Sequence, residues 1–326
     1  MTSPSRQTGL SALQAHFAGL GVTPVTRFAP SPTGFLHLGH IAAALAVWGI
    51  GRILGAKVLL RIEDHDRIRT RLEYEDAAIA DLSWFGFVPD NCLTDNCVQD
   101  NGAAGSQKLL PEFYQRNRLE RYATLAKQLG QQGDTYFCNC TRRQIKARTA
   151  EQSQDELYYD GHCRTLSEGK PDSGIRIRVP HETIPFFDYC LGAGGQNPAT
   201  QCGDFLIKDR KGNWTYQFAV ACDDHDQGVN LIIRGEDLYP STGRQILLQQ
   251  KLFGHSPPIA YWHHGLIRDE TGGKLSKRFL SEGARNLGTT PGPILKEAAK
   301  VLGVDSAEEW DLGSWPKVLQ EALTSG

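Results

Sequence analysis

Two histidines, His37 and His40, stand three residues apart in the string RFAPSPTGFLHLGH, which covers residues 27–40. Two prolines stiffen the turn after a strand-like run, and Gly34 and Gly39 let the backbone come close to a ligand. A helix that begins near Gly39 would present unpaired N–H groups and the positive end of its dipole, which suit a phosphate. Both histidines could therefore face one anion. A Pro/Gly turn with two surface histidines is the competing interpretation.

A cluster of cations, KLSKR at residues 274–278, follows the pair Gly272–Gly273. The two glycines permit hinge motion of the loop that carries the cluster. Taken by themselves, these residues are more simply interpreted as a solvated basic loop.

Three of the eight cysteines, Cys138, Cys140 and Cys163, form a candidate metal site. Three thiols and one further ligand satisfy tetrahedral zinc. The Cys-x-Cys pair is tighter than the common Cys-x-x-Cys, so three buried thiols without a metal remain an alternative. Each of the other five is expected to be a small buried hydrophobic residue: Cys92, Cys97, Cys190, Cys202 and Cys222. A loop cross-link or a second metal is the alternative at Cys92 and Cys97.

Strand-like and helical runs alternate around these residues. Thr23–Ala29 and Lys57–Ile62 predict strands, whereas Ile41–Leu54 and Glu73–Phe85 predict helices. This order is typical of a parallel sheet with crossover helices, and hence of an α/β fold. Strand-like spacing returns in three later segments, Asp204–Ile207, Tyr216–Cys222 and Val229–Arg234, and the chain from His255 onward is mostly helical and polar.

The composition is that of a globular protein of about two domains. The 326 residues are 40% hydrophobic and 22% charged, which excludes a disordered tail and a collagen-like rod. A net charge of −2 gives no global argument for a nucleic-acid partner, which must rest on local basic patches. The sequence has no apolar run of membrane-spanning length and no signal-peptide pattern in its first 23 residues, so we expect a cytoplasmic protein.

The string at 27–40 resembles the "HIGH" region of class I aminoacyl-tRNA synthetases in their glutamyl form. Four further motifs match that family in the expected order: RIED at 61–64, YQFAVACDD at 216–224, LIIRGEDL at 231–238 and KLSKR at 274–278. The resemblance covers residues 26–279 and implies a Rossmann-like parallel-sheet catalytic domain.

The same resemblance implies a binding site for glutamate. Arginine binds a carboxylate through two parallel hydrogen bonds, so Arg27 and Arg234 are the candidates that read the side-chain carboxylate, while Glu63 would hold the ammonium group. The glutamate-binding residues implied in this way are Arg27, Phe28, Ala29, Pro30, Ser31, Glu63, Tyr216 and Arg234. The alternatives are a surface salt bridge of Glu63 to a neighbouring arginine and, for Tyr216, a core aromatic with a satisfied hydroxyl.

ATP would bind at the two motifs that carry histidines and lysines. KLSKR is similar to the mobile "KMSKS" loop, whose second lysine contacts ATP; that position is Lys277. Its charge could stabilise the phosphates as pyrophosphate departs. The resemblance thus implies three catalytic residues, His37, His40 and Lys277. It also implies five that bind ATP as its Mg²⁺ complex: His37, Gly39, His40, Lys274 and Lys277.

Cys-x-Cys followed by Tyr-x-Gly-x-Cys occurs in the truncated glutamyl-synthetase paralogues, the glutamyl-Q tRNA(Asp) synthetases, whose zinc uses three cysteines and a tyrosine. Carried over, the ligands of one structural zinc ion are Cys138, Cys140, Tyr159 and Cys163. Tyr158 and His162 compete for the fourth position. The helix expected at Thr141–Ala150 carries four basic residues and no acid, so it either meets tRNA phosphates or is a solvated face.

The resemblance also divides the chain. We expect an N-terminal extension (1–23), a catalytic domain in two halves (24–117 and 214–255), an inserted acceptor-type module with the zinc site (118–213) and a helical stem-contact region (256–326). The 48 residues that follow Arg278 are fewer than an anticodon-binding domain of usual size needs.

This architecture favours the glutamyl-Q family, which activates glutamate with ATP and transfers it to the queuosine base of tRNA(Asp). Two alternatives remain: a minimal glutamyl-tRNA synthetase that charges a tRNA 3′ end, and a catalytically inactive paralogue that acts as a binding module. The intact HLGH and KLSKR strings argue against the inactive paralogue. No obligate protein partner is evident from the sequence.

Overall fold

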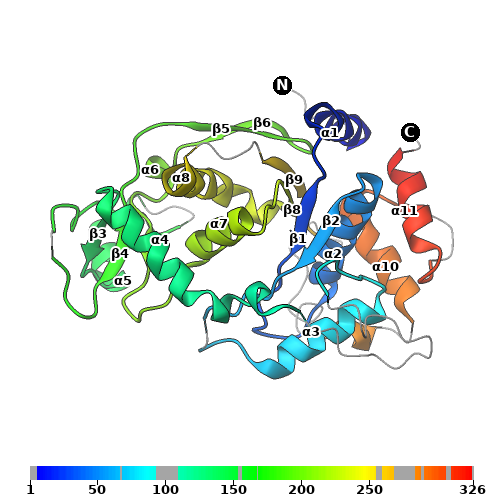
Figure 1. Cartoon of the computed structure of the whole chain (residues 1–326), viewed down its shortest axis with the longest axis horizontal. Helices are drawn as coiled ribbons and strands as arrows, with labels where there is room; N and C mark the ends of the chain where they lie inside the picture. Colours follow the sequence, from blue (N-terminus) through cyan, green and yellow to red (C-terminus); the bar gives the residue numbers. More distant parts are fainter. Residues whose placement is uncertain are drawn as a thin grey trace.

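The computed structural model describes residues 6–66, 68–92, 109–152, 156–166, 168–254, 259–267, 283–287, 290–305 and 310–324. Its first unit is a parallel strand pair with a crossover helix (Figure 1). Strand β1 (Val25–Phe28) pairs with β2 (Lys57–Leu60), and α2 (Leu38–Ile53) connects them. Helix α2 is apolar almost all round because it is covered on both sides, and 11 of its 16 residues are buried. These elements confirm the strand–helix–strand pattern predicted for this part of the sequence.

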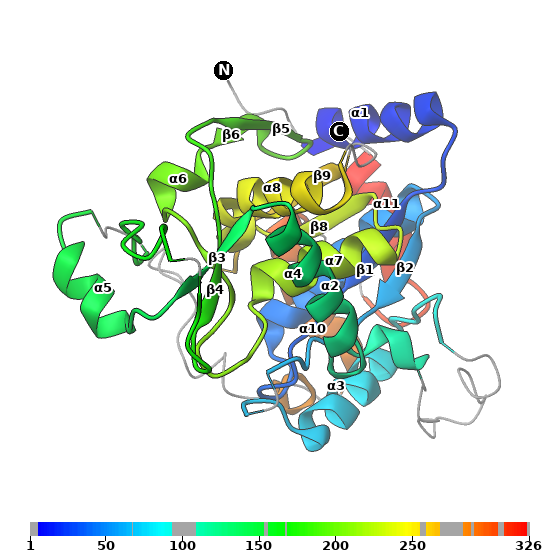
Figure 2. The ribbon, with the colours of Figure 1, turned by 60° about the vertical axis from the view of Figure 1, so that its left-hand side comes forward.

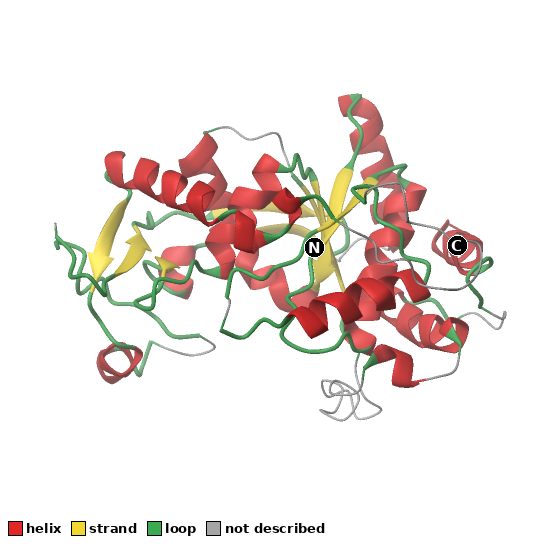
Figure 3. Ribbon diagram, turned by 60° about the horizontal axis from the view of Figure 1, so that its bottom comes forward, coloured by secondary structure: helices red, strands yellow, loops and turns green. Residues whose placement is uncertain are grey.

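A four-stranded sheet continues this layer in the order β6-β5-β9-β8. Strands β8 (Leu231–Gly235) and β9 (Ala260–His264) are parallel, and β5 (Ile184–Asp188) and β6 (Gly192–Gln196) form an antiparallel hairpin beside β9. The N–H of Asn230, just before β8, donates to the carbonyl of Val25, so β1 lies next to β8. The mainly parallel central layer confirms the predicted α/β fold with helices on its faces (Figure 3).

Helices from both ends of the chain cover this layer. Helix α3 (Leu72–Trp84) follows β2, and α10 (Pro291–Ala299) and α11 (Trp315–Thr324) pack against α2. Helix α1 (Arg6–Leu20) lies in the segment expected to be an extension, yet it buries Leu10, Leu13 and Phe17 in the same core. The described residues contain no helix long and apolar enough to cross a bilayer.

A smaller three-stranded sheet stands apart from the central layer (Figure 2). Its antiparallel strands are β3 (Thr135–Cys138), β4 (Gly174–Ile177) and β7 (Leu206–Lys208). Helix α4 (Leu119–Gln131) leads into it, α5 (Arg142–Arg148) follows β3, and α6 (Pro198–Gln201) precedes β7. A second apolar core joins α4 and this sheet to α7 (Tyr216–Asp226) and α8 (Thr242–Phe253).

Two local predictions were wrong. Tyr216–Cys222, expected as a strand, begins helix α7. The run is buried on several faces, so its apolar residues show no clear period, and periodicity cannot separate a buried helix from a buried strand. Ala260–His264, placed in a helical region, is strand β9. The β5–β6 hairpin belongs to the central sheet, although its residues fall in the range assigned to the insert; the domain boundaries themselves stay predictions.

Candidate active site

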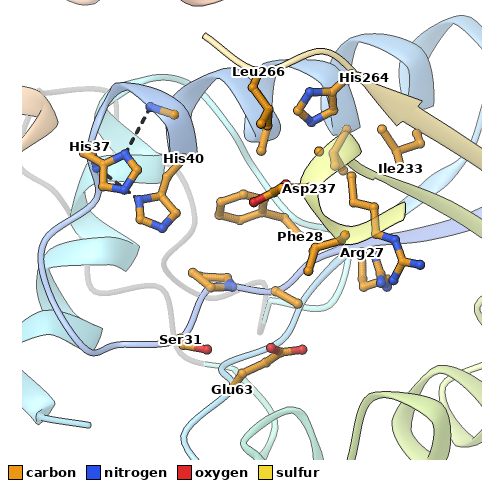
Figure 4. A pocket seen from close by; sticks show the side chains of 18 of the residues that line it. Arg27, Phe28, Ser31, His37, His40, Glu63, Ile233, Asp237, His264 and Leu266 are labelled. Atoms are coloured by element: carbon orange, nitrogen blue, oxygen red, sulfur yellow. Dashed lines mark hydrogen bonds between the residues drawn. The ribbon is translucent and has the colours of Figure 1, made fainter. Parts of the chain in front are cut away.

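A cavity of about 580 Å³ opens at the carboxyl ends of β1 and β8. This is where ligands bind in open α/β sheets. Its lining includes the eight residues predicted to bind glutamate and three of those predicted at ATP, namely His37, Gly39 and His40. Figure 4 shows His37 and His40 on one side of the cavity, with Arg27 and Glu63 on another. Lys274 and Lys277 lie outside the described residues.

His37 and His40 are fixed by the start of α2. His37 is the N-cap: its Nδ1 accepts the N–H of Gly39 at 3.1 Å, and its own N–H donates to Nδ1 of His40 at 3.2 Å (Figure 4). The two rings lie 3.8 Å apart. Burial, with a smaller effect of nearby His37, lowers the pKa of His40 to about 3. His40 is therefore a neutral ring whose proton is on Nε2, a donor suited to a phosphate oxygen.

Arg27 and Glu63 belong to a buried network of charges. Asp224 on α7 accepts from Nε of Arg27 at 3.0 Å and from Arg61 at 2.7 Å. Burial opposes ionisation of Asp224, but the two arginines outweigh it and hold its pKa below the usual value. Glu63 is 5% exposed and lies 3.3 Å from Arg61, so the surface salt bridge considered for it is wrong: the pair is buried.

The Glu63 carboxyl has an unusual environment. Burial raises its pKa, although Arg61 and Arg27 oppose the change. A cationic group bound beside Glu63 would favour its ionised form. Tyr216, the first residue of α7, also lines the cavity, and burial raises the pKa of its hydroxyl, so it stays a neutral phenol.

Arg234, at the end of β8, differs from the other two arginines because its protein partners are uncharged. Its Nε donates to Nε2 of His263 at 2.9 Å, and its terminal nitrogens donate to Gln245 at 2.7 Å and to Thr242 at 2.9 Å. The side chain is 5% exposed, and among the described residues no carboxylate forms an ion pair with it. A buried guanidinium without a direct counter-ion favours an anionic ligand.

A second, polar cavity of about 390 Å³ adjoins the first, and Ser31, Thr33, Glu63 and Tyr216 line both. Its other walls carry His65, Asp66, Arg69, Thr70, Asp209, Asn213, Trp214 and Thr215. No sequence motif predicts this cavity, because segments 65–70 and 209–215, which form most of its walls, are 139 positions apart at their nearest residues.

The three predicted zinc thiols come together in the smaller sheet. The sulfurs of Cys138, Cys140 and Cys163 all lie within 4.8 Å of one another. The Tyr159 hydroxyl is 3.4 Å from the Cys138 sulfur and accepts the N–H of Cys163 at 2.9 Å. Three thiols and a phenol oxygen at these distances fit one tetrahedral zinc ion. His162, the competing fourth ligand, is exposed and does not join the group.

The chain matches known proteins over most of its length. Residues 24–295 match the family of class I tRNA synthetases (E and Q), catalytic domain. A protein of Burkholderia cenocepacia named Glutamyl-Q tRNA(Asp) synthetase is 39% identical over 284 residues, which cover 85% of this chain and 87% of the relative. A protein of the same name from Geobacter sulfurreducens is 36% identical over 304 residues, covering 91% and 90%.

Solved structures agree with these matches. The glutamate–tRNA synthetase of Elizabethkingia anophelis superposes with a TM-score of 0.63 and 27% identity, over 79% of this chain and 53% of that one. A glutamate–tRNA ligase of Elizabethkingia meningosepticum, solved with its amino acid, gives 0.63 and 28%, over 79% and 52%. This chain thus spans about half the length of those ligases. It belongs to the class I tRNA synthetases of the glutamate and glutamine group, a family of ligases, and groups with the glutamyl-Q tRNA(Asp) synthetases within it.

Proposed function

We propose that the protein activates L-glutamate with ATP and transfers the glutamyl group to the queuosine base of tRNA(Asp). The observation that carries the choice of amino acid is Arg234, a buried cation held by neutral partners at the wall of the cavity. The choice of acceptor rests on the names of relatives that align with 85–91% of the chain. A cytoplasmic location is part of the same proposal.

Each step of activation has residues to serve it. Arg234 and Arg27 hold the side-chain carboxylate, and Glu63 binds the ammonium group. An oxygen of the α-carboxylate attacks the α-phosphorus of ATP; a new O–P bond forms, and the bond to the β-phosphate breaks to release pyrophosphate. The carboxylate is already ionised, so no general base is needed, and positioning with charge neutralisation does the work. The phosphates of ATP enter with Mg²⁺ and are bound by His37, Gly39, His40, Lys274 and Lys277.

The second cavity suits the acceptor. It touches the glutamate site through Ser31, Thr33, Glu63 and Tyr216, and its lining is rich in hydroxyl, amide and carboxylate groups. A polar nucleoside placed there could direct a hydroxyl toward the activated carboxyl carbon. The hydroxyl oxygen would form the ester as the bond between the carboxyl carbon and the AMP phosphate oxygen breaks, and the hydroxyl proton would pass to the phosphate of the departing AMP.

Glutamate should appear on tRNA(Asp) only when that tRNA carries queuosine, and removal of the 3′ CCA end should not abolish the transfer. Labelled glutamate can be followed on queuosine-containing and queuosine-free tRNA(Asp), with tRNA(Glu) alongside. Enzymatic trimming is preferred to periodate, which destroys the queuosine diol as well as the 3′ diol. If trimming abolishes charging, the protein is a minimal synthetase for a tRNA 3′ end. If ATP–pyrophosphate exchange with glutamate is absent, the result favours the alternative that the protein is a catalytically inactive binding module.

Zinc is part of the proposal, as a structural ion held by Cys138, Cys140, Tyr159 and Cys163, with no position left for an activated water. The smaller sheet that carries this site also presents α5, where Arg142, Arg143 and Lys146 are exposed. This helix is suited to tRNA phosphates, and such contacts make binding depend on salt. Loss of zinc should therefore affect the tRNA step more than activation.

Elemental analysis should find one zinc ion per chain, and Cys140→Ser should lose it. We expect this variant to lower transfer to tRNA by roughly tenfold or more, because ligand loss loosens the module that meets the tRNA, while pyrophosphate exchange changes little. Cys92→Ser, outside the cluster, is the matched control and should keep both zinc and transfer. Equal damage to both steps, or a native protein without zinc, contradicts this role.

A further inference from the structure

The Arg234 guanidinium is joined to a buried aspartate that does not line the cavity. Asp188, the last residue of β5, has its Oδ2 2.5 Å from Nδ1 of His263 on β9. Nε2 of the same imidazole faces Nε of Arg234 at 2.9 Å. Asp188 and His263 are both 0% exposed. A carboxylate, an imidazole and a guanidinium thus form one chain across three strands.

The hydrogen bonds that link Asp188, His263 and Arg234 fix the tautomer of His263. Nε of Arg234 carries a single hydrogen and can only donate, so Nε2 of His263 must accept. The imidazole proton is therefore on Nδ1, where it is donated to Asp188. Burial lowers the pKa of His263, although the Asp188 hydrogen bond opposes this, which agrees with a neutral ring.

Two further contacts hold the guanidinium plane. Its terminal nitrogens donate to Thr242 and to the side-chain oxygen of Gln245, and the Gln245 amide is turned that way because its nitrogen donates to Gln217 at 3.0 Å. A guanidinium has five N–H groups. Three have acceptors among the described residues, where one N–H on each terminal nitrogen is left for a ligand.

We propose that Asp188 and His263 are positioning residues for amino-acid selection. They set the orientation of Arg234 and balance its charge from a distance, through a neutral ring. Arg27 is paired with Asp224 directly. In the Asp188–His263–Arg234 relay, by contrast, the imidazole separates the Asp188 carboxylate from the guanidinium of Arg234. The terminal nitrogens of Arg234 therefore stay available for the substrate carboxylate. This inference rests on the proposed role of Arg234 in binding glutamate.

Asp188→Asn tests the relay because it keeps the shape of the side chain. The asparagine oxygen can still accept the N–H groups of Cys190 and Leu191, which Asp188 accepts at 2.9 and 2.8 Å. Its amide nitrogen then faces Nδ1 of His263 and donates to it, while the bond that Oδ2 accepts from the His263 backbone N–H at 3.1 Å is lost. The imidazole proton moves to Nε2, where it opposes the N–H of Arg234. In a catalytic Asp–His pair the same substitution likewise selects the wrong tautomer.

We expect Asp188→Asn to raise the KM for glutamate by roughly 10–100-fold, by analogy with the loss seen when the outer hydrogen-bond partner of a metal ligand is removed. The KM for ATP and the kcat at saturating glutamate should change less than about threefold, and preference for glutamate over glutamine should fall. Asp134→Asn is the matched control: it removes a carboxylate paired with Lys251, away from the cavity, and should leave all four quantities unchanged. A folded Asp188→Asn protein with an unaltered KM for glutamate overturns the proposal.

A second measurement needs no variant. Long-range ¹H–¹⁵N spectra of the wild-type protein, with His263 assigned through its own Cβ and Hα, should show a neutral ring protonated on Nδ1. A proton on Nε2 rules the relay out, even if Asp188→Asn does not fold. The proposed function is tested separately by exchange with the wild-type enzyme: activation of an amino acid other than glutamate would refute that function, while the spectrum would still decide on the relay.

Discussion

Arg234→Ala should lower kcat/KM for glutamate activation by roughly 30-fold to several hundredfold. This corresponds to about 2–4 kcal/mol, the usual cost of truncating one partner of a buried, hydrogen-bonded charge pair. The reason is that the substrate carboxylate would lose a bidentate partner in a cavity with few other cations. ATP–pyrophosphate exchange over a range of glutamate concentrations measures the effect.

The same exchange assay should show that the wild-type enzyme activates glutamate far better than glutamine. An amide cannot accept two charged hydrogen bonds, so it leaves the arginine unpaired. Arg121→Ala, which removes an arginine paired with Asp226 outside the cavity, is the control and should behave as wild type. Equal exchange rates for the two amino acids would contradict the assignment of Arg27 and Arg234 to the side-chain carboxylate of glutamate.

Lys277→Ala should lower the rate of glutamyl-adenylate formation by roughly 100-fold, the scale on which one preorganised charge stabilises a transition state. Its ammonium is needed chiefly when the phosphates rearrange, so glutamate affinity should change little. Single-turnover formation of the adenylate gives the rate, and equilibrium binding gives the affinity.

Lys300→Ala provides a matched lysine control, because its ammonium pairs with Glu297 on a helix that packs against α2. It should retain both the rate and the affinity. If glutamate binding of Lys277→Ala collapsed while its rate of adenylate formation persisted, Lys277 would have another role.

The first strands and helices could be predicted because their sequence patterns are local. Strand-like runs at Thr23–Ala29 and Lys57–Ile62, with the helical run Ile41–Leu54 between them, directly reflect β1, α2 and β2. Helix α7 could not be separated from a strand, since Phe218, Ala219, Ala221 and Cys222 are all buried and leave no polar face to mark the period.

In the candidate site, too, residues within sequence motifs could be predicted, whereas contacts made by tertiary packing could not. Arg27, Glu63, Tyr216 and Arg234 were named from motifs, and the structure places them around one cavity. Asp224 lay within a matched motif, but its role as the shared partner of Arg27 and Arg61 depends on how α7 packs against β1 and β2. Asp188 lies outside every matched motif. Its contact with His263 depends on pairing between strands, which a single sequence does not show.

The junction of β5 and β9 has a consequence for the order in which this protein acquires its shape. Asp188 and His263 are 75 residues apart, and among the described residues β9 is the last strand of the central layer to leave the ribosome. Closing so long a loop carries an entropic cost that delays such contacts relative to local ones. A nascent chain that ends before β9 already contains Arg27, Glu63 and Arg234 but lacks the histidine that orients the last of them. Recognition of the amino acid therefore becomes complete only when β9 docks, which makes ligand binding a direct reporter of that docking step.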